Sequence, residues 1–493
     1  MITVFLMSTS VAKLVCAQSA LSGNAQLLAD KITMTTAPVQ RNLGDGHLRI
    51  YRLALAATGE YTRFFGGKVE AMAAQTKAVE RINELYERDL SIRFEIIPDN
   101  HKVVFTDPET DPYVVTNSNQ MMLQNQKIID HIIGSENYDI GHLFFVNKRS
   151  DGISENQGVC QNETKAMGVT GAAQPTGDHF YIDYVAHEMG HQIGAHHTMS
   201  NRCQQYPKTA VEPGSGSTLM SYAGICFPNV QMHNDPYFHS VNLEEVLPFL
   251  VTSGDGCAQR IPVAGHWPHI DKMTQHADIP VSTPFVLMAE ASDADGDQIT
   301  YCWEQMNPST DVPMPPRSFF TNGPLFRSLP PVFEGKRFFP PLADIVSNRP
   351  TLWQVLPSND ATLKFNLTVR DNAAGGGRVT IASAQVNVFK SAGPFQVDAP
   401  GETTWKAGSL YQVTWAVAET DKAPINCSTV DILLSANGGK SFDHVLAAGV
   451  PNKGTAQVKA PDLESKNVFL MVRPVDNIFF TVTTSPLVIK KLE

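Results

Sequence analysis

The 493-residue chain has only seven cysteines, no run of lysine or arginine, and no stretch of about 18 uninterrupted apolar residues. So few cysteines exclude a disulfide-built scaffold, and the missing apolar stretch excludes a transmembrane segment. The net charge is −11. Because phosphate contacts need a basic face, no nucleic acid is expected as a partner. The 42% hydrophobic content excludes a disordered chain, and the length suggests three domains.

The N-terminus resembles a secretory leader. Residues 1–18 are mostly apolar and contain a small-residue cleavage pattern, Val-Cys-Ala, before Gln18. Lys13 interrupts the apolar run and the usual basic start is missing, so a truncated gene start or a buried N-terminal segment stays an alternative. Removing Cys16 with the leader would leave six cysteines, an even number that fits an oxidising compartment. We therefore expect a secreted, extracellular protein.

Hydrophobic periodicity divides the rest of the chain. Residues 19–46 are polar and patternless, which predicts a linker or a remnant of a pro-segment. Residues 47–258 alternate strand and helix patterns, which predicts an α/β domain with a mostly parallel sheet. Its predicted strands are 49–56, 92–96 and 140–146, and its predicted helices are 68–88 and 118–133.

Beyond this domain the pattern changes to short apolar runs separated by prolines and turns. Strand signals recur through residues 262–390 and 394–491, with a boundary at the Ser-Ala-Gly-Pro segment of residues 391–394. This spacing predicts two all-β sandwich domains. The first resembles cadherin-like or PKD-like domains, and the second resembles fibronectin-like or immunoglobulin-like domains. A surface, a glycan or a protein is the kind of ligand expected for such modules.

Residues 187–197 read HEMGHQIGAHH and satisfy the pattern H-E-x-x-H-x-x-G-x-x-H. His187 and His191 are four residues apart, so on a helix they share one face and can bind one metal ion. Gly194 can adopt a left-handed conformation that ends the helix, and His197 then supplies a third nitrogen. Three protein ligands with an open fourth position are typical of catalytic zinc. Solvated or core histidines on an ordinary helix are the alternative.

Glu188 follows the first histidine, where its carboxylate can reach a zinc-bound water. Zinc lowers the pKa of such a water to about 7 and polarises a scissile carbonyl. Glu188 is therefore the predicted general base, which accepts the proton of the water and passes it to the leaving amine. His196 is predicted to be a surface residue or a neighbour of the ligands, not a ligand.

Residues 217–222 read STLMSY and follow the zinc motif at a spacing that resembles the metzincins. In that clan a methionine-containing turn lies beneath the three histidines, and Met220 occupies the matching position. Tyr222 matches a position where some metzincins carry a tyrosine that ligates zinc or stabilises the oxyanion. An ordinary buried tyrosine is the alternative.

The wider segment, residues 211–226, together with the strand–helix order before it, resembles the reprolysin-like (adamalysin-type) metallopeptidases of secreted bacterial proteins. The resemblance extends over residues 47–258. One departure is Thr198, because adamalysins proper carry an aspartate after the third histidine. The resemblance also implies that residues 165–171 form the edge strand to which an extended peptide substrate adds.

The same resemblance implies two disulfides, Cys203–Cys226 and Cys160–Cys257. The first would join the chain beyond the third histidine to the chain beyond Met220, and the second would tie the end of the α/β domain to its sheet. Cys302 and Cys427 fall in separate β domains and are expected to be free thiols.

An aspartate cluster in the first β domain could bind calcium. Asp293, Asp295 and Asp297 alternate across a glycine turn, and calcium prefers clustered hard oxygens. A solvated aspartate turn is the alternative.

Together these features predict a secreted zinc metalloendopeptidase that hydrolyses peptide bonds of protein or peptide substrates. Two alternatives stay open: an adhesin or binding protein with a vestigial protease domain, and a zinc hydrolase acting on a non-peptide amide.

Overall fold

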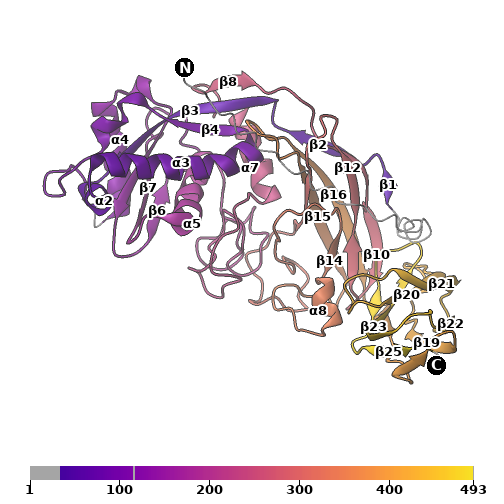
Figure 1. Ribbon diagram of the computed structural model, residues 1–493. Helices are drawn as coiled ribbons and strands as arrows, with labels where there is room; N and C mark the ends of the chain where they lie inside the picture. Colours follow the sequence, from indigo (N-terminus) through magenta and orange to yellow (C-terminus); the bar gives the residue numbers. More distant parts are fainter. Residues whose placement is uncertain (1–33, 115–116, 492–493) are drawn as a thin grey trace, which may run out of the picture.

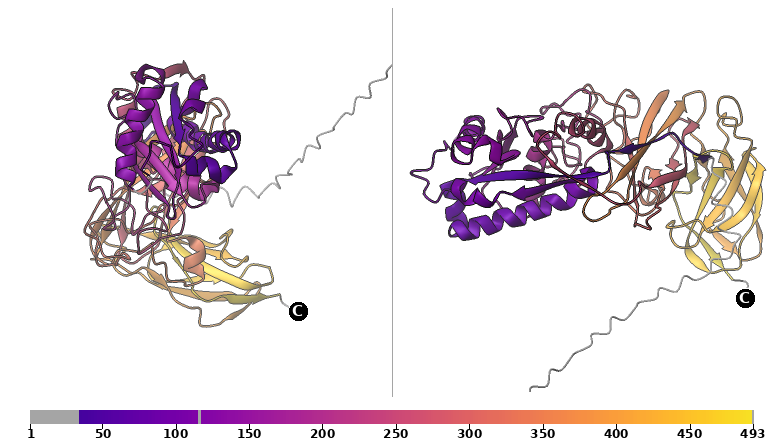
Figure 2. Two further views of the ribbon diagram at one scale, coloured as in Figure 1. Left: turned by 90° about the vertical axis from the view of Figure 1, so that its left-hand side faces the viewer. Right: turned by 90° about the horizontal axis from the view of Figure 1, so that it is seen from above.

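The computed structural model describes residues 34–114 and 117–491, so the leader predicted over residues 1–18 lies outside the described residues. An α/β domain and two β domains follow one another along an elongated molecule (Figures 1 and 2). This is the fold class predicted from the sequence. Within the described residues, the helices lack the length and hydrophobicity that a bilayer span requires.

A six-stranded sheet forms the centre of the α/β domain, in the order β4-β3-β5-β7-β6, with β8 paired to β3. Strands β4, β3, β5 and β7 are parallel, whereas β6 and β8 are antiparallel to their neighbours. The strands are β3 (His47–Ala57), β4 (Ile92–Ile96), β5 (Ile140–Val146), β6 (Asp151–Ser154), β7 (Gly168–Ala172) and β8 (Gln259–Pro262). The helical segments are α2 (Gly59–Phe65), α3 (Lys68–Leu90), η1 (Pro98–Val103), α4 (Ser118–Ile132), η2 (Ser135–Asn137), α5 (Gly177–Phe180), η3 (Tyr181–Ala186), α6 (His187–Gln192) and α7 (Ser240–Leu250).

Alternate residues of the central strands face opposite layers of helices. Leu53 of β3 belongs to the core that contains α3, whereas its neighbour Ala54 belongs to the core that contains α4. The period of two along a strand explains this division. Because both faces are covered, the central strands read as continuous apolar runs, which is why β3 and β5 could be predicted from the sequence.

The edge of the sheet differs from the prediction. Residues 165–171 were expected to be the edge strand, but β7 lies between β5 and β6, and β6 ends the sheet. Strand β6 is only four residues long, Asp-Gly-Ile-Ser, and is partly exposed throughout. So short and polar a segment carries no alternation of hydrophobicity that could have revealed it.

The segment predicted as a linker contributes strands to the first β domain. Strand β1 (Thr35–Thr36) pairs with β9, and β2 (Gln40–Leu43) pairs with β16. Residues 35–43 therefore run along the first β domain before the chain enters β3 of the α/β domain (Figure 1). The polar sequence of β2, Gln-Arg-Asn-Leu, is half exposed, and it left no hydrophobic signal.

Two main sheets build each β domain. In the first they are β1-β9-β12 and β10-β16-β15-β13 with β2, and in the second β17-β19-β22 and β18-β25-β23-β20-β21 with β24. The first contains β9 (His269–Met273), β10 (His276–Pro280), β11 (Phe285–Leu287), β12 (Ala289–Ser292), β13 (Thr300–Gln305), β14 (Arg337–Phe339), α8 (Leu342–Val346), β15 (Ala361–Arg370) and β16 (Val379–Phe389). The second contains β17 (Gln396–Val397), β18 (Thr404–Lys406), β19 (Leu410–Ala416), β20 (Thr429–Ser435), β21 (His444–Pro451), β22 (Thr455–Lys459), β23 (Ser465–Pro474), β24 (Thr481–Val482) and β25 (Leu487–Lys490).

One continuous hydrophobic core joins the two β domains. Phe338 of the first domain packs edge-on against Phe480 of the second, with ring centroids 5.5 Å apart. The backbone N–H of Val286 donates to the carbonyl of Ile478 at 3.0 Å. The two β domains are thus packed against each other and not merely connected by a linker.

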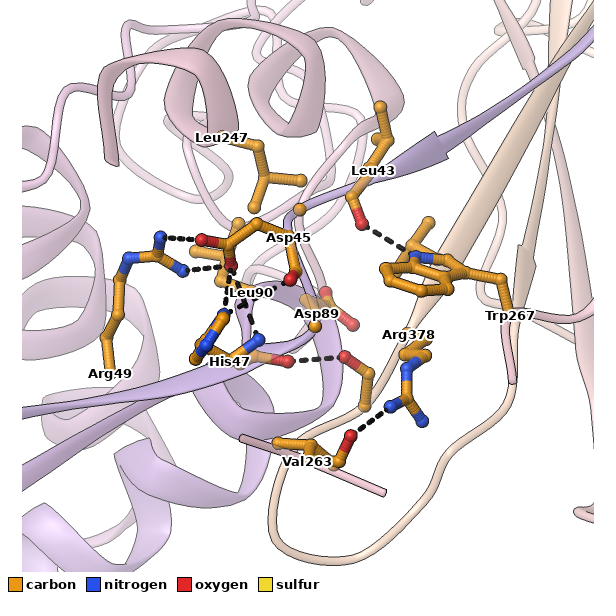
Figure 3. A pocket seen from close by; sticks show the side chains of 15 residues that line it. Leu43, Asp45, His47, Arg49, Asp89, Leu90, Leu247, Val263, Trp267 and Arg378 are labelled. Atoms are coloured by element: carbon orange, nitrogen blue, oxygen red, sulfur yellow. Dashed lines mark hydrogen bonds and ion pairs between the residues drawn. The ribbon is translucent and has the colours of Figure 1, made fainter. Parts of the chain in front are cut away.

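Polar contacts fix the joint between the α/β domain and the first β domain (Figure 3). The indole N–H of Trp267 donates to the carbonyl of Leu43 at 2.9 Å. The Arg378 guanidinium lies over the Trp267 ring, 5.0 Å from its centroid, and donates to the carbonyl of Val263 at 2.5 Å. These bonds fasten β2 and the segment after β8, the two parts of the chain that pass between the domains, where the domains meet.

A buried ion pair crosses the same joint. Arg370, at the end of β15, donates to Asp89 of α3 at 2.9 Å, and both side chains are fully buried. Burial alone would raise the pKa of Asp89, but the guanidinium groups of Arg370 and Arg88 outweigh it and lower the pKa to about 2. Asp89 also accepts the backbone N–H of Phe238. This carboxylate therefore connects three segments that are distant in the sequence.

Replacing Asp89 tests the importance of this contact. In Asp89→Ala the Arg370 charge would stay buried without its partner, so we expect a loss of about 3 to 5 kcal/mol in the free energy of unfolding. Denaturant unfolding measures the loss. As a control, Glu290→Ala removes an exposed ion pair with Lys272 and should leave the unfolding midpoint nearly unchanged. Equal midpoints for both variants would contradict the assignment.

Candidate metal centre

The predicted zinc motif begins on the last segment of one long helical stretch made of α5, η3 and α6. The middle segment, Tyr181–Ala186, is π-helical and leads directly into α6. Gly194 then has a φ of +102°, the left-handed conformation expected for it, and the backbone N–H of Ala195 returns to the carbonyl of Gly190 at 2.9 Å. The chain reverses there, which carries His197 back toward the helix.

Three histidine nitrogens converge in front of this helix. The Nε2 atoms of His191 and His197 are 3.0 Å apart, and those of His197 and His187 are 3.2 Å apart. Each ring uses its other nitrogen for a backbone carbonyl. His187 Nδ1 donates to Leu219 at 2.9 Å, His191 Nδ1 to Ala195 at 2.7 Å, and His197 Nδ1 to Gln204 at 2.7 Å.

This hydrogen-bond pattern fits a metal ion. Because a carbonyl only accepts, each Nδ1 carries the proton, and three unprotonated Nε2 atoms point at one another. Zn–N bonds of about 2.05 Å at the tetrahedral angle put two nitrogens about 3.3 Å apart, close to the separations observed. Burial lowers the pKa of His187 to about 3 and of His197 to about 4, and that of His191 in the same direction, so all three rings are neutral. The residues present can therefore hold zinc.

The turn around Met220 supports two of the three histidines. Leu219 accepts from His187, and the carbonyl of Met220 accepts the N–H of Thr198, next to His197, at 3.1 Å. A Cβ placed at Gly190 would lie 2.5 Å from the Met220 sulfur. Only glycine at this position lets the helix rest directly on the turn. Met220 is fully buried beneath the site, in the place that the resemblance implies.

Glu188 lies between the first two histidines on α6 and faces strand β6. The Ser154 hydroxyl donates to its carboxylate at 2.8 Å and also contacts its backbone carbonyl. Burial raises the pKa of Glu188 to about 8, and the Asp151 carboxylate adds to the rise, whereas the Ser154 hydrogen bond opposes it. A divalent cation at the histidines would lower this pKa again, because an opposite charge favours the ionised form.

Tyr222 lies beside the histidines. Its ring centroid is 4.5 Å from that of His197 and 5.6 Å from that of His187. Burial raises the pKa of Tyr222, with a smaller contribution from Glu188, so the hydroxyl stays protonated and can donate. It donates to the Gln204 side chain at 3.1 Å. This hydrogen-bonded hydroxyl matches the alternative interpretation of Tyr222, and a role in zinc ligation or oxyanion stabilisation stays a prediction.

The remaining predicted residues lie outside the triad in the α/β domain, or in the β domains. His196 turns away from the metal position, stacks on Tyr206 with centroids 3.8 Å apart, and pairs with Glu245 at 3.1 Å. The disulfides Cys160–Cys257 and Cys203–Cys226 are both present, with Cα separations of 5.4 and 6.2 Å. These are the pairs that the resemblance implies. The thiols of Cys302 and Cys427 are free and buried.

Glu212 is a supporting residue that sequence reasoning did not single out. Its fully buried carboxylate accepts the Thr198 hydroxyl at 2.7 Å, the Ser217 N–H at 2.8 Å, and both the N–H and the hydroxyl of Thr218. It thus ties the segment after the third histidine to the segment before Met220. In the sequence Glu212 is simply an acidic residue before a run of small residues, Pro-Gly-Ser-Gly-Ser. The spacing identifies no hydrogen-bond partner for it.

The family of the first domain is decided by this geometry together with a family model. Residues 47–240 match the model described as metallo-peptidase family M12B, reprolysin-like. These residues form a reprolysin-like metzincin domain. The M12B family is one of zinc-dependent metallopeptidases, and the histidine triad of this domain is in place for the metal. No curated protein matches the chain.

Solved structures similar to this chain contain fibronectin-like and immunoglobulin-like domains. The chicken CNTN1 FN1–FN3 domains are 10% identical, with 47% of this chain and 72% of that chain covered and a TM-score of 0.19. The tandem Ig repeats of Dlar are 12% identical (46% and 100% covered, TM-score 0.24). The CbhA fibronectin(III)-like modules of Clostridium thermocellum are 12% identical (46% and 93% covered, TM-score 0.16). The description of the β domains rests on their own sheets.

The aspartate cluster in the first β domain is held by its own turn. Asp293 accepts the backbone N–H groups of Asp295 at 2.9 Å and Asp297 at 3.2 Å, and Asp295 pairs with His266 at 3.0 Å. These contacts are those of an aspartate turn. Calcium at this position stays a prediction from the sequence.

A conservative change at Glu212 tests its supporting role. Glu212→Gln replaces one acceptor oxygen by an N–H₂ group that faces donors, so we expect a loss of about 3 kcal/mol in stability. Because the ligand segment would loosen, zinc affinity should fall about 10- to 100-fold. Denaturant unfolding and competition with a fluorescent chelator measure the two effects. Glu244→Gln, on the partly exposed face of α7, is the matched control. Unchanged zinc affinity in Glu212→Gln would limit this residue to a purely structural role.

Proposed function

We propose that the protein is a secreted zinc metalloendopeptidase in which Glu188 is the general base. The observation that supports this most directly is the convergence of three unprotonated histidine Nε2 atoms beside a buried carboxylate on the same helix. Three neutral nitrogens and one acid are the groups that metal-assisted amide hydrolysis needs.

The residues would divide the chemistry as follows. His187, His191 and His197 hold the zinc ion, which when bound acidifies water and polarises the scissile carbonyl. Glu188 takes a proton from the attacking water and returns it to the leaving amine. Ser154 holds the Glu188 carboxylate in place through its hydrogen bond. Tyr222, whose ring lies against those of His187 and His197, would donate its hydroxyl to the oxyanion.

A protein or peptide substrate fits the edge of the sheet. Strand β6 ends the sheet, and its Ser154 contacts Glu188 directly. An extended peptide that adds to this edge by main-chain hydrogen bonds would pass beside the general base. The edge strand β6 therefore contacts the proposed general base directly, which supports this position for the substrate.

Secretion is supported by the cysteines. Four of them form two disulfides, which persist in oxidising compartments. The proposed domains are a leader over residues 1–18, the peptidase domain over 47–258, and sandwich domains over 262–390 and 394–491, the first of which also takes up strands β1 and β2. A surface, glycan or protein ligand for the β domains is part of the proposal.

Two other functions need an experiment to separate them from this one. An adhesin with a vestigial protease domain need keep neither the ligands nor the base, and the retention of all four side chains in this chain supports the peptidase. Zinc content combined with casein cleavage distinguishes the possibilities. Zinc without cleavage would favour the vestigial domain or a hydrolase of non-peptide amides.

Replacing the proposed base gives the sharpest test. Glu188→Gln keeps the shape and removes the proton acceptor, so kcat/KM on a peptide should fall by at least about 100-fold. Zinc content should stay at the wild-type value. The variants His187→Ala and His197→Ala are the complement, since they should lose zinc together with activity. Cleavage by Glu188→Gln at nearly the wild-type rate would reject the mechanism.

Tyr222→Phe examines the oxyanion role. If the hydroxyl stabilises the transition state, kcat should fall about 10- to 1000-fold with little change in KM. Steady-state kinetics on one peptide substrate separates the two constants, and thermal unfolding reports any loss of stability. Gln204→Ala removes the present partner of the hydroxyl and serves as the control. A change in unfolding temperature with kcat intact would make Tyr222 a structural residue only.

A further inference from the structure

A second group of metal-binding side chains lies on the surface of the peptidase domain. His179 in α5 and Asp183 in η3 belong to the helical stretch that continues into the zinc motif, and His233 comes from the chain after Met220. His179 Nδ1 is 2.8 Å and His233 Nδ1 is 2.7 Å from the same Asp183 oxygen, Oδ2. One candidate ligand atom of each residue lies within 4.8 Å of those of the other two.

We propose that His179, Asp183 and His233 form an accessory site for a divalent transition-metal ion such as Zn²⁺. Around a tetrahedral zinc ion with bonds of about 2.0 to 2.2 Å, neighbouring ligand atoms lie about 3.3 to 3.6 Å apart, so each nitrogen would move away from the carboxylate oxygen by less than about 1 Å to admit the ion. Two imidazoles with one carboxylate favour zinc, copper or nickel over calcium. Each ring would present Nδ1 to the ion in the tautomer that carries its proton on Nε2.

The carboxylate is held in position by an outer partner. Asp183 has a side chain that is only 7% exposed, and its other oxygen, Oδ1, accepts the backbone N–H of Asn234 at 2.8 Å. Such outer hydrogen bonds orient metal ligands and raise their affinity. The two histidine side chains are 50% and 64% exposed, which gives an ion and its remaining water ligands access from solvent.

The position of the site suggests what the ion would do. Asn234 donates through its side chain to the carbonyl of Leu219 at 3.1 Å, and Leu219 is the residue that accepts from His187. An ion bound to Asp183 would therefore fasten the helix to the segment that supports the first histidine of the triad. Its ligands are separate from the triad, so this proposal does not rest on the proposed function.

Metal stoichiometry tests the proposal. We would dialyse the full chain to equilibrium against buffered free Zn²⁺ and measure zinc per chain by mass spectrometry. The wild type should bind two ions, and His179→Ala/His233→Ala should bind one. The control His266→Ala/His276→Ala removes two exposed imidazoles that each pair with a single aspartate, and should keep two. Added Zn²⁺ should also raise the unfolding temperature of the wild type more than that of the His179/His233 variant.

A further variant separates this site from the triad. His187→Ala/His191→Ala should keep one ion, and that ion should disappear when His179→Ala/His233→Ala is added. If the triad variant instead kept both ions, the proposed function would fail and the accessory site would stand. Equal zinc content in the wild type and the His179/His233 variant would overturn the accessory site. The ion retained by that variant shows at the same time that it is folded.

Discussion

The metal centre depends above all on three backbone carbonyls, which keep the proton of each ligand histidine on Nδ1. Leu219, Ala195 and Gln204 come from different segments, yet each accepts from the Nδ1 of one histidine. The unprotonated Nε2 of His197 then lies 3.0 Å from that of His191 and 3.2 Å from that of His187, an arrangement that repels without a cation and becomes favourable with one. Other contacts hold the neighbouring segments: Glu212 binds Thr198, Ser217 and Thr218, and Asn234 donates to the Leu219 carbonyl.

These supports extend beyond the peptidase domain. Ser328 and Glu304, both buried in the first β domain, contact the chain around the metal-supporting turn. The Ser328 carbonyl accepts from the Ser217 hydroxyl, the Ser328 hydroxyl lies 2.7 Å from that of Tyr237, and Glu304 accepts the N–H of Ser240. Buried polar groups of this kind are costly when left without partners. The first β domain is therefore part of the support of the metal centre.

The sequence predicted the parts of this arrangement that follow from periodicity or spacing. Strand β5, helix α3 and the helix with His187 and His191 depend on local patterns, and they lie where expected. Gly194 is similarly local, because its left-handed turn is a property of one residue. The edge strand β6 and the strand β2 are short and polar, and tertiary pairing alone makes them strands. Glu212 escaped prediction for a related reason, since its donors are identified only by folding.

The departure at Thr198 can be explained in the same terms. The resemblance expects an aspartate after the third histidine, and this chain instead presents a hydroxyl there, bonded to the carboxylate of Glu212. A carboxylate is thus still connected to the position after His197, but it comes from another segment and also binds Ser217 and Thr218. The Thr198 hydroxyl therefore connects the position after His197 to an acidic group of another segment. A residue-by-residue comparison would record the aspartate as missing at position 198. The folded chain brings the carboxylate of Glu212 to Thr198 instead.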